Sequence, residues 1–215
     1  MDNSFTVVRG DPFGVAVRIG RMQTRRAIRD DIGPAAQMLA SAFADDPWFQ
    51  WLYPESSQWP DAPAAWFRLV LDRVFDKGHT YLAAHAACAW IPPDVEFPSE
   101  FDVGLAVDLL SSQIGERAAE ALGVIGSAGA SFQDRPPRFH CVYVGVPLLS
   151  QRQGAGSALL ARILNECDAE GFPASLTSTN DVNLSLYRSL GFVEINEIPI
   201  PGTQNSMRPM WRDPQ

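Results

Sequence analysis

The sequence is short of positive charge. It contains 17 Lys and Arg residues against 25 Asp and Glu residues, which gives a formal net charge of −8 at pH 7. Such a charge repels the phosphates of nucleic acids at long range, so no nucleic-acid partner is expected. The acidic balance suits a cationic small molecule, or solubility alone.

Cysteine and histidine are also scarce. Three cysteines, Cys88, Cys141 and Cys167, are too few and too scattered for a disulfide framework or a zinc site. The three histidines, His79, His85 and His140, lack the spacing of metal ligands. The sequence therefore predicts no metal.

Long hydrophobic runs are absent. No stretch approaches the roughly 18 apolar residues that a membrane span needs, so no membrane partner is expected. The N-terminus carries Asp2 and Asp11 and has no uninterrupted apolar region, so no secretory signal is expected. Together these absences predict a cytoplasmic location.

What the chain does contain is enough apolar material for one substantial core. It has 215 residues, of which 46% are hydrophobic. Residues 1–22 show only a brief alternation and are interpreted as an N-terminal extension. Residues 23–215 are interpreted as a single mixed α/β domain, as a monomer or a homodimer.

Helical and strand patterns alternate along this domain. Asp31 is expected to be the N-cap of a helix that ends near Ala44, before Asp46 and Pro47. Residues 94–138 show the weakest helix and strand patterns. The other expected helices are 62–76, 99–110, 115–126, 157–170 and 182–190, and the expected strands are 25–28, 80–84, 86–91, 139–146, 174–179, 192–198 and 206–211.

The most informative stretch is an apolar strand that leads into Gln151-x-x-Gly154-x-Gly156 and then into a helix. Glycines let a ligand approach the backbone closely, and free N–H groups at a helix start attract phosphate. A P-loop would need a lysine, which the turn lacks, and a dinucleotide fingerprint would need a third glycine. A tight helix start without a ligand is the remaining structural alternative.

A second motif follows about thirty residues later, Asn180-Asp-Val-Asn183 and then Leu186-Tyr187-x-x-Leu-Gly191-Phe192. The two motifs in register resemble the GNAT superfamily of N-acetyltransferases over about residues 24 to 213. Segments near Ala42–Pro47 and Trp90–Pro93 are similar to the branch of puromycin N-acetyltransferase-like enzymes. The resemblance implies an α+β fold with a mixed, mostly antiparallel sheet of about six or seven strands, splayed in the middle and flanked by helices on both faces.

The resemblance also implies acetyl-CoA as cofactor. Backbone groups at Val144 and Val146 would bind the pantetheine and acyl carbonyl, although both valines also suit a core. Arg152 would reach a phosphate or lie in solvent, and the asparagines would contact pantetheine or cap the next helix. The implied cofactor-binding residues are Val144, Val146, Gln151, Arg152, Gln153, Gly154, Ala155, Gly156, Ser157, Asn180 and Asn183.

Tyr187 is the implied catalytic residue. In the family a neutral amine attacks the thioester directly, and a tyrosine hydroxyl near the sulfur can donate the proton that the thiolate needs. The alternative is a tyrosine that only packs under the cofactor. The strand before the turn has no glutamate to act as a base. Strand alternation places His140 on one face with Val142, Val144 and Val146, and it is either that base or a hydrogen-bonded structural histidine.

The acceptor side is less defined, and the segment 94–138 is expected to close over the acceptor. Asp45, Asp46 and Trp48, with Trp51 and Tyr53, form either an anionic aromatic pocket for a cationic acceptor or a helix end with a hydrophobic staple. The function expected is acetyl-CoA-dependent transfer of an acetyl group to a primary amine of a small molecule, through a ternary complex. Alternatives are a non-catalytic acyl-CoA-binding module and, less consistent with the motifs, a nicotinamide dehydrogenase.

Overall fold

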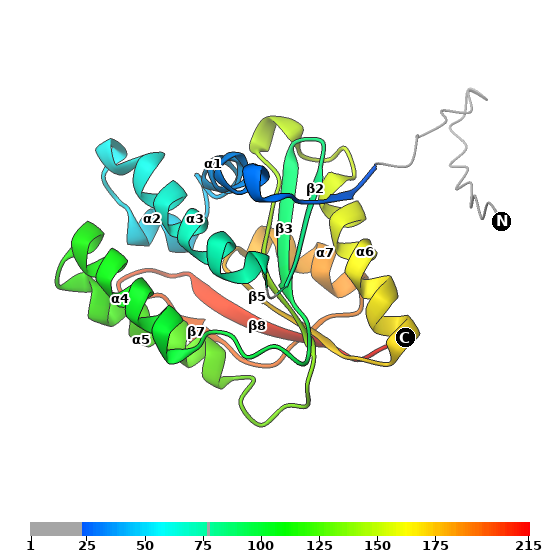
Figure 1. Ribbon diagram of the computed structural model, residues 1–215. Helices are drawn as coiled ribbons and strands as arrows, with labels where there is room; N and C mark the ends of the chain where they lie inside the picture. Colours follow the sequence, from blue (N-terminus) through cyan, green and yellow to red (C-terminus); the bar gives the residue numbers. More distant parts are fainter. Residues whose placement is uncertain (1–22, 77) are drawn as a thin grey trace, which may run out of the picture.

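A sheet of eight strands forms the centre of the computed structural model, which describes residues 23–76 and 78–215 (Figure 1). The extension expected at residues 1–22 lies outside these residues. The sheet is mostly antiparallel, as expected, but it has eight strands rather than six or seven, because three two-residue strands also pair. The strands are β1 (Arg25–Arg26), β2 (His79–Ala83), β3 (Ala86–Ile91), β4 (Phe139–Gly145), β5 (Ala174–Ser178), β6 (Val193–Glu194), β7 (Ile198–Pro199) and β8 (Ser206–Arg212).

The strand order is β1-β2-β3-β4-β5-β8-β6, and β7 pairs with β8. All neighbouring strands are antiparallel except β4 and β5, which are parallel and lie in the middle of the sheet. This central parallel pair is the strand pair on either side of the glycine turn.

Helices cover both faces of the sheet. Successive residues of β3 alternate between two core clusters, which the period of a strand requires. One cluster joins Ala87, Ala89 and Ile91 to α1–α5, and the other joins the remaining β3 residues to α6 and α7 (Figure 1). The helices are α1 (Ile32–Ala42), α2 (Pro47–Leu52), α3 (Asp61–Phe75), α4 (Glu100–Ile114), α5 (Arg117–Ala130), α6 (Ala155–Glu170) and α7 (Leu184–Ser189).

The local differences from the expected elements have identifiable causes. Asp31 is the N-cap residue of α1, as expected, but its side chain does not cap the helix, because the carboxylate pairs with Arg25 and accepts a hydrogen bond from the Ile28 N–H. The aromatic segment after Pro47 is the helix α2, which the sequence analysis did not anticipate. Within the described residues, no helix has the length and apolar composition of a membrane span.

Candidate active site

The parallel strands β4 and β5 part in the middle of the sheet. They pair at three positions, Phe139 with Ala174, His140 with Ser175 and Cys141 with Leu176. Beyond Cys141, β4 continues to Gly145 without pairing with β5. A cavity of about 480 Å³ lies between the parted ends, and it is called the wedge cavity below.

The glycine turn forms one end of the wedge cavity. Gly154 is the N-cap of α6 and has φ +87°, a left-handed conformation that glycine adopts without strain. A Cβ at Gly154 would meet no atom within 4 Å, so the space in front of this helix start is open. The Gln151 side chain donates a hydrogen bond to the Val146 carbonyl at 3.1 Å. The turn residues that line the wedge cavity are Gln151, Arg152, Gly154, Ala155, Gly156 and Ser157, whereas Gln153 is not among them.

The first N–H groups of α6 have no partners inside the helix, and the dipole of this 16-residue helix makes its N-terminus positive. A phosphate group at this position would be stabilised by both effects. The turn therefore fits the diphosphate of coenzyme A, and the parted strands fit a narrow chain that continues from it.

The other expected cofactor residues also surround the wedge cavity. Val144, Val146, Asn180 and Asn183 all line it. The Asn180 side chain accepts a hydrogen bond from the Val182 N–H at 3.1 Å, so it caps the short helical turn that follows. For Asn180 the structural and the cofactor-facing interpretations are thus compatible.

Tyr187 lies where the wedge cavity meets a second, larger cavity. Its side chain is buried on α7, with its ring centroid 6.3 Å from that of Phe192. Burial is the main cause that raises the pKa of the phenol above its ordinary value, and the thiol of Cys141 and the carboxylate of Asp46 add to it. Tyr187 is therefore protonated at neutral pH, which is the state that a proton donor requires.

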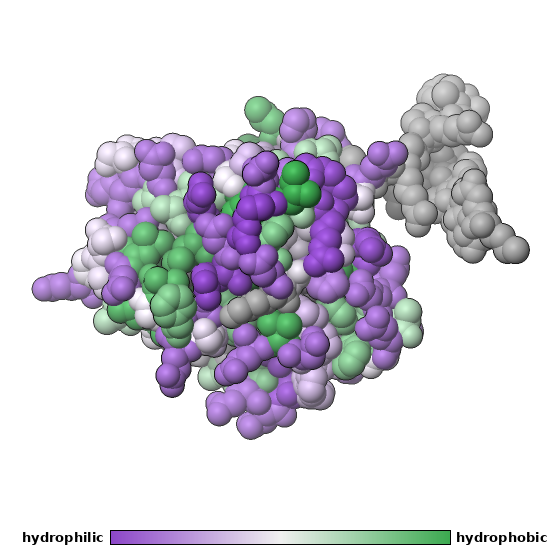
Figure 2. Space-filling view, in the orientation of Figure 1, coloured by the Kyte–Doolittle hydropathy of each residue, from purple (hydrophilic) through white to green (hydrophobic). Residues whose placement is uncertain are grey.

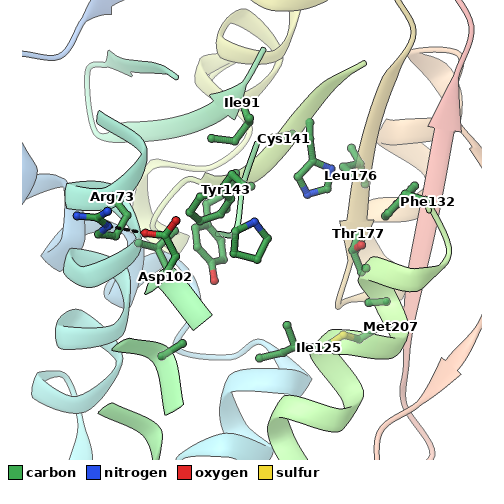
Figure 3. A pocket seen from close by; sticks show the side chains of 18 of the residues that line it. Arg73, Ile91, Asp102, Ile125, Phe132, Cys141, Tyr143, Leu176, Thr177 and Met207 are labelled. Atoms are coloured by element: carbon green, nitrogen blue, oxygen red, sulfur yellow. Dashed lines mark hydrogen bonds and ion pairs between the residues drawn. The ribbon is translucent and has the colours of Figure 1, made fainter. Parts of the chain in front are cut away.

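The larger cavity has a volume of about 810 Å³ (Figure 3). Its walls come from β3, β4 and β5 on the sheet side and from α3, α4 and α5 on the other. In Figure 3 the side chains of Ile91 and Tyr143 come from the sheet, and those of Ile125 and Phe132 lie opposite. Four residues line both cavities and so mark their junction, namely Phe43, Val144, Asn183 and Tyr187.

A β-bulge divides the side chains of β4 between the two cavities. Ala89 pairs with Tyr143 and Trp90 with Cys141, so Val142 is one extra residue on β4. A bulge reverses the alternation of the strand beyond it. Tyr143 consequently packs with α1 and α3, and Val144 packs in the other cluster.

The bulge corrects the expected position of His140. Regular alternation placed His140 on one face with Val142, Val144 and Val146, and His140 and Val142 do line the same cavity. His140 lines the larger cavity and contacts the ring of Phe132 at a centroid distance of 5.6 Å, whereas Val146 packs in the core cluster of α6 and α7.

His140 is held in its neutral form. Its Nδ1 lies 2.8 Å from Ser175 Oγ, which also accepts a hydrogen bond from Arg138 Nε at 3.0 Å. Burial, with a smaller contribution from Arg138, lowers the pKa of His140 to about 4. These contacts match the interpretation of a hydrogen-bonded structural histidine, and so low a pKa makes it a weak base.

The acidic and aromatic residues expected on the acceptor side do not form one pocket. Asp46 accepts hydrogen bonds from the N–H groups of Trp48 and Phe49 at 3.0 and 3.3 Å and from the Thr179 hydroxyl at 2.6 Å. Burial raises the pKa of Asp46. Asp45 and Asp46 line the wedge cavity, whereas Trp48 lines the larger one, so the single anionic aromatic pocket is not formed.

The remaining aromatic residues of that expected pocket are occupied within the protein. Trp51 stacks on Trp48 with ring centroids 5.0 Å apart, and the guanidinium of Arg117 lies 4.7 Å from its ring. The Tyr53 hydroxyl donates to Gln113 at 2.7 Å. In the described part of the chain, no three His, Cys, Asp or Glu side chains are grouped to hold a metal ion.

The sequence patterns did not indicate Tyr143, and they did not show which residues of the segment 94–138 line the larger cavity. The Tyr143 hydroxyl accepts a hydrogen bond from Trp66 Nε1 at 2.7 Å, and burial raises its pKa. Its position on the motif strand was a usable signal. The lining residues of α5 had no such signal, because they are glycines and aliphatic residues in the segment with the weakest patterns.

A model of the acetyltransferase (GNAT) family matches residues 39–192. Among solved structures, the chain is similar to a histone acetyltransferase HPA2 and related acetyltransferase from Corynebacterium glutamicum, with 22% identity, coverage of 90% of this chain and 96% of that one, and a TM-score of 0.67. It is also similar to arylalkylamine N-acetyltransferase 2 from Aedes aegypti, with 11% identity, 90% and 99% coverage and a TM-score of 0.67. An apo agmatine N-acetyltransferase matches with 14% identity, 90% and 100% coverage and a TM-score of 0.62. At these identities the structures share the fold.

Proposed function

Because the chain belongs to the acetyltransferase (GNAT) family, we propose that it transfers an acetyl group from acetyl-CoA directly to a primary amine of a small molecule, through a ternary complex. The observation that supports this proposal most is the junction of two cavities at Tyr187. The wedge cavity suits the cofactor, and the larger cavity opens a separate path to the same point.

The residues of the wedge cavity fit coenzyme A. The N–H groups at the start of α6, after the open space at Gly154, would hold the diphosphate. The backbone of β4 at Val144 and Val146, which β5 leaves unpaired, would hold the pantetheine arm and the acyl carbonyl. Asn180 and Asn183 would order the loop that faces this arm. When bound, acetyl-CoA supplies an acetyl group that is activated as a thioester.

Tyr187 supplies the proton in this proposal. Its buried hydroxyl keeps its proton at neutral pH, and its position at the junction brings it toward both cavities. It would deliver that proton to the departing sulfur while the amine attacks the thioester carbonyl from the larger cavity, and the proton that the amine nitrogen loses would restore the phenol. The domain at residues 23–215 would carry the whole activity. Its three free, buried cysteines fit the reducing conditions of a cytoplasmic location.

The test combines cofactor binding with turnover. Acetyl-CoA at about 100 times its dissociation constant should raise the free energy of unfolding by about 2.7 kcal/mol, whereas NAD should not. Thiol release should then require an amine. The variant Tyr187→Phe should keep the stabilisation by acetyl-CoA and lower kcat by about 100-fold, because it removes only the hydroxyl.

Each part of the proposal has its own opposing result. Unchanged turnover in Tyr187→Phe would exclude Tyr187 as the proton donor. Stabilisation by acetyl-CoA without acetylation of any amine in a broad panel would indicate a non-catalytic acyl-CoA-binding module. Absence of stabilisation by acetyl-CoA would exclude the cofactor assignment itself.

A further inference from the structure

The larger cavity is far bigger than an amino group needs. Its volume of about 810 Å³ lies in the range of sites that enclose a whole drug-sized ligand, roughly 300 to 1,000 Å³. Its wall is mainly aromatic and aliphatic, with Trp48, Trp66, Phe132 and Ile125 among the lining side chains. A ligand that fills this space gains stability mainly by burying its own apolar surface.

The charges in the wall argue against an acceptor with several ammonium groups. Of the described residues that line the cavity, two carry carboxylates. Asp102 is held by Arg73 at 2.5 Å and by the Ser99 hydroxyl at 2.6 Å (Figure 3), and Glu96 is exposed. Arg138 adds a further positive charge to the wall. A second ammonium group inside would be desolvated beside cations, which is strongly unfavourable.

The same wall favours a neutral amine. A low-dielectric environment disfavours the protonated form of an amine and lowers its pKa. This effect suits a site whose candidate base on β4, His140, has a pKa of about 4. An amine attached to an apolar body is therefore delivered in the state that attacks a thioester.

Helix α5 determines how much room the acceptor has. Leu122, Ile125, Gly126 and Gly129 follow one face of the helix at three- and four-residue spacing, and all four line the cavity. A Cβ at either glycine would meet no atom within 4 Å. Glycine inside a helix costs about 1 kcal/mol relative to alanine, so helix stability does not explain the two residues, whereas the space that they leave does.

Resting on the acetyltransferase function proposed above, we propose that the acceptor is a monoamine with a bulky, uncharged apolar body, which occupies the larger cavity, and that Gly126 and Gly129 set its maximum size. The amino group lies at the junction marked by Tyr187, and the body extends between the sheet and α5. Of the hydrophobic residues that α4 exposes, Val103 and Val107 also line the larger cavity, and Figure 2 shows a hydrophobic patch on this side of the molecule.

The first experiment measures thiol release with propylamine, hexylamine, phenylbutylamine and spermidine. Each added methylene should raise kcat/KM about fourfold, because burying one methylene stabilises by about 0.8 kcal/mol. The kcat/KM for phenylbutylamine should be at least as high as that for hexylamine. The kcat/KM for spermidine should be at least about tenfold lower than that for hexylamine. A preference for spermidine, or no dependence on the apolar body, would overturn the proposal.

The second experiment fills the cavity from α5. Gly126→Leu and Gly129→Leu each place a side chain in the open space and use a good helix former, so the fold should be kept. They should lower kcat/KM for phenylbutylamine at least about tenfold and change that for propylamine less than about twofold. Gly123→Leu is the matched control, because Gly123 lies on α5 outside the cavity lining and also has open space around it. Equal losses for both amines would contradict the proposal.

Binding measurements separate this proposal from the proposed function. If no amine in the panel is acetylated, the acetyltransferase proposal fails, but calorimetry with phenylbutylamine and CoA still tests the cavity. Binding to the wild type that is lost in Gly126→Leu and kept in Gly123→Leu supports an apolar amine site. Absence of binding to the wild type overturns it. Acetylation of propylamine and spermidine with no acetylation of phenylbutylamine overturns this inference alone.

Discussion

Asp46 offers the sharpest test of how the acceptor side is built. Its carboxylate caps α2 through the N–H groups of Trp48 and Phe49 and accepts the Thr179 hydroxyl hydrogen bond, so it ties α2 to the segment after β5. Those two elements border the two cavities. The structure thus assigns Asp46 a positioning task, whereas the sequence also allowed it to bind a cationic acceptor directly.

Two substitutions distinguish the tasks. Asp46→Ala removes the cap, which costs about 1 kcal/mol, and leaves the Thr179 hydroxyl without its partner, which costs about 1–3 kcal/mol more. The free energy of unfolding should therefore fall by about 2–4 kcal/mol. Asp46→Asn keeps one oxygen for the cap and presents an amide that Thr179 can accept from, so the change should stay within about 1 kcal/mol.

The charge itself does not contribute to folding stability here. Burial raises the pKa of Asp46 in the folded state, so ionisation favours the unfolded chain as the pH rises above the unfolded pKa. The neutral asparagine avoids this cost at pH 7. Asp46→Asn should accordingly be as stable as the wild type or slightly more stable at neutral pH.

The two variants are compared with the wild type by urea unfolding and by steady-state kinetics with a monoamine. We expect a large loss of stability in Asp46→Ala, near-wild-type stability in Asp46→Asn, and a KM for the amine within about threefold of the wild type in Asp46→Asn. Equal stability of both variants would refute the capping argument. A KM for the amine raised at least about tenfold in Asp46→Asn, with stability unchanged, would instead show that the carboxylate binds the acceptor.

Two further predictions concern β4. A Cβ at Gly145 would lie 2.7 Å from Leu39 Cδ2 and 2.9 Å from Ala42 Cβ. Gly145→Ala should therefore lower the free energy of unfolding by about 1–3 kcal/mol and weaken the stabilisation by acetyl-CoA, both measured by thermal shift against Gly123→Ala. Unchanged stability would contradict the close packing of β4 on α1. Burial lowers the pKa of His140 from 6.5 to about 4 in the folded state. The neutral imidazole therefore contributes fully to the free energy of unfolding above pH 6.5, and this contribution is lost as the pH falls toward 4. Between these pH values the wild type should lose about 3 kcal/mol more unfolding free energy than His140→Asn, and parallel urea-midpoint curves would refute the burial of a neutral imidazole.

The parts of the site that the sequence predicted are those with local signals. The left-handed φ values of Gly154 and Gly191 are properties of single residues, and each marks a helix end that the motifs located. α6 begins at Ala155 rather than Ser157, a difference of two residues that is ordinary for a helix start. The short helix α2 also had a readable signal, since Asp46 and Pro47 are the preferred residues at an N-cap and the following position.

The parts that the sequence did not predict depend on pairing between distant segments. The bulge at Val142 is a property of β3 and β4 together, and nothing in the strand itself marks the extra residue. The expected helices 99–110 and 115–126 correspond to α4 and α5, but which of their residues line the larger cavity depends on how the two helices pack against the sheet. Predicting the larger cavity from the sequence would require both the bulge and the packing of these helices.

The bulge and the parting of the strands act together on the site. β4 ends its pairing with β5 at Cys141, and the extra residue at Val142 follows at once. As a result, Tyr143 lines the larger cavity and Val144 lines the junction of the two cavities. The backbone of β4 beyond Cys141, which does not pair with β5, is left for a ligand. A regular strand would turn Tyr143 toward the core cluster of α6 and α7. The extra residue therefore contributes to the junction at which the larger cavity and the wedge cavity meet, where the buried Tyr187 lines both.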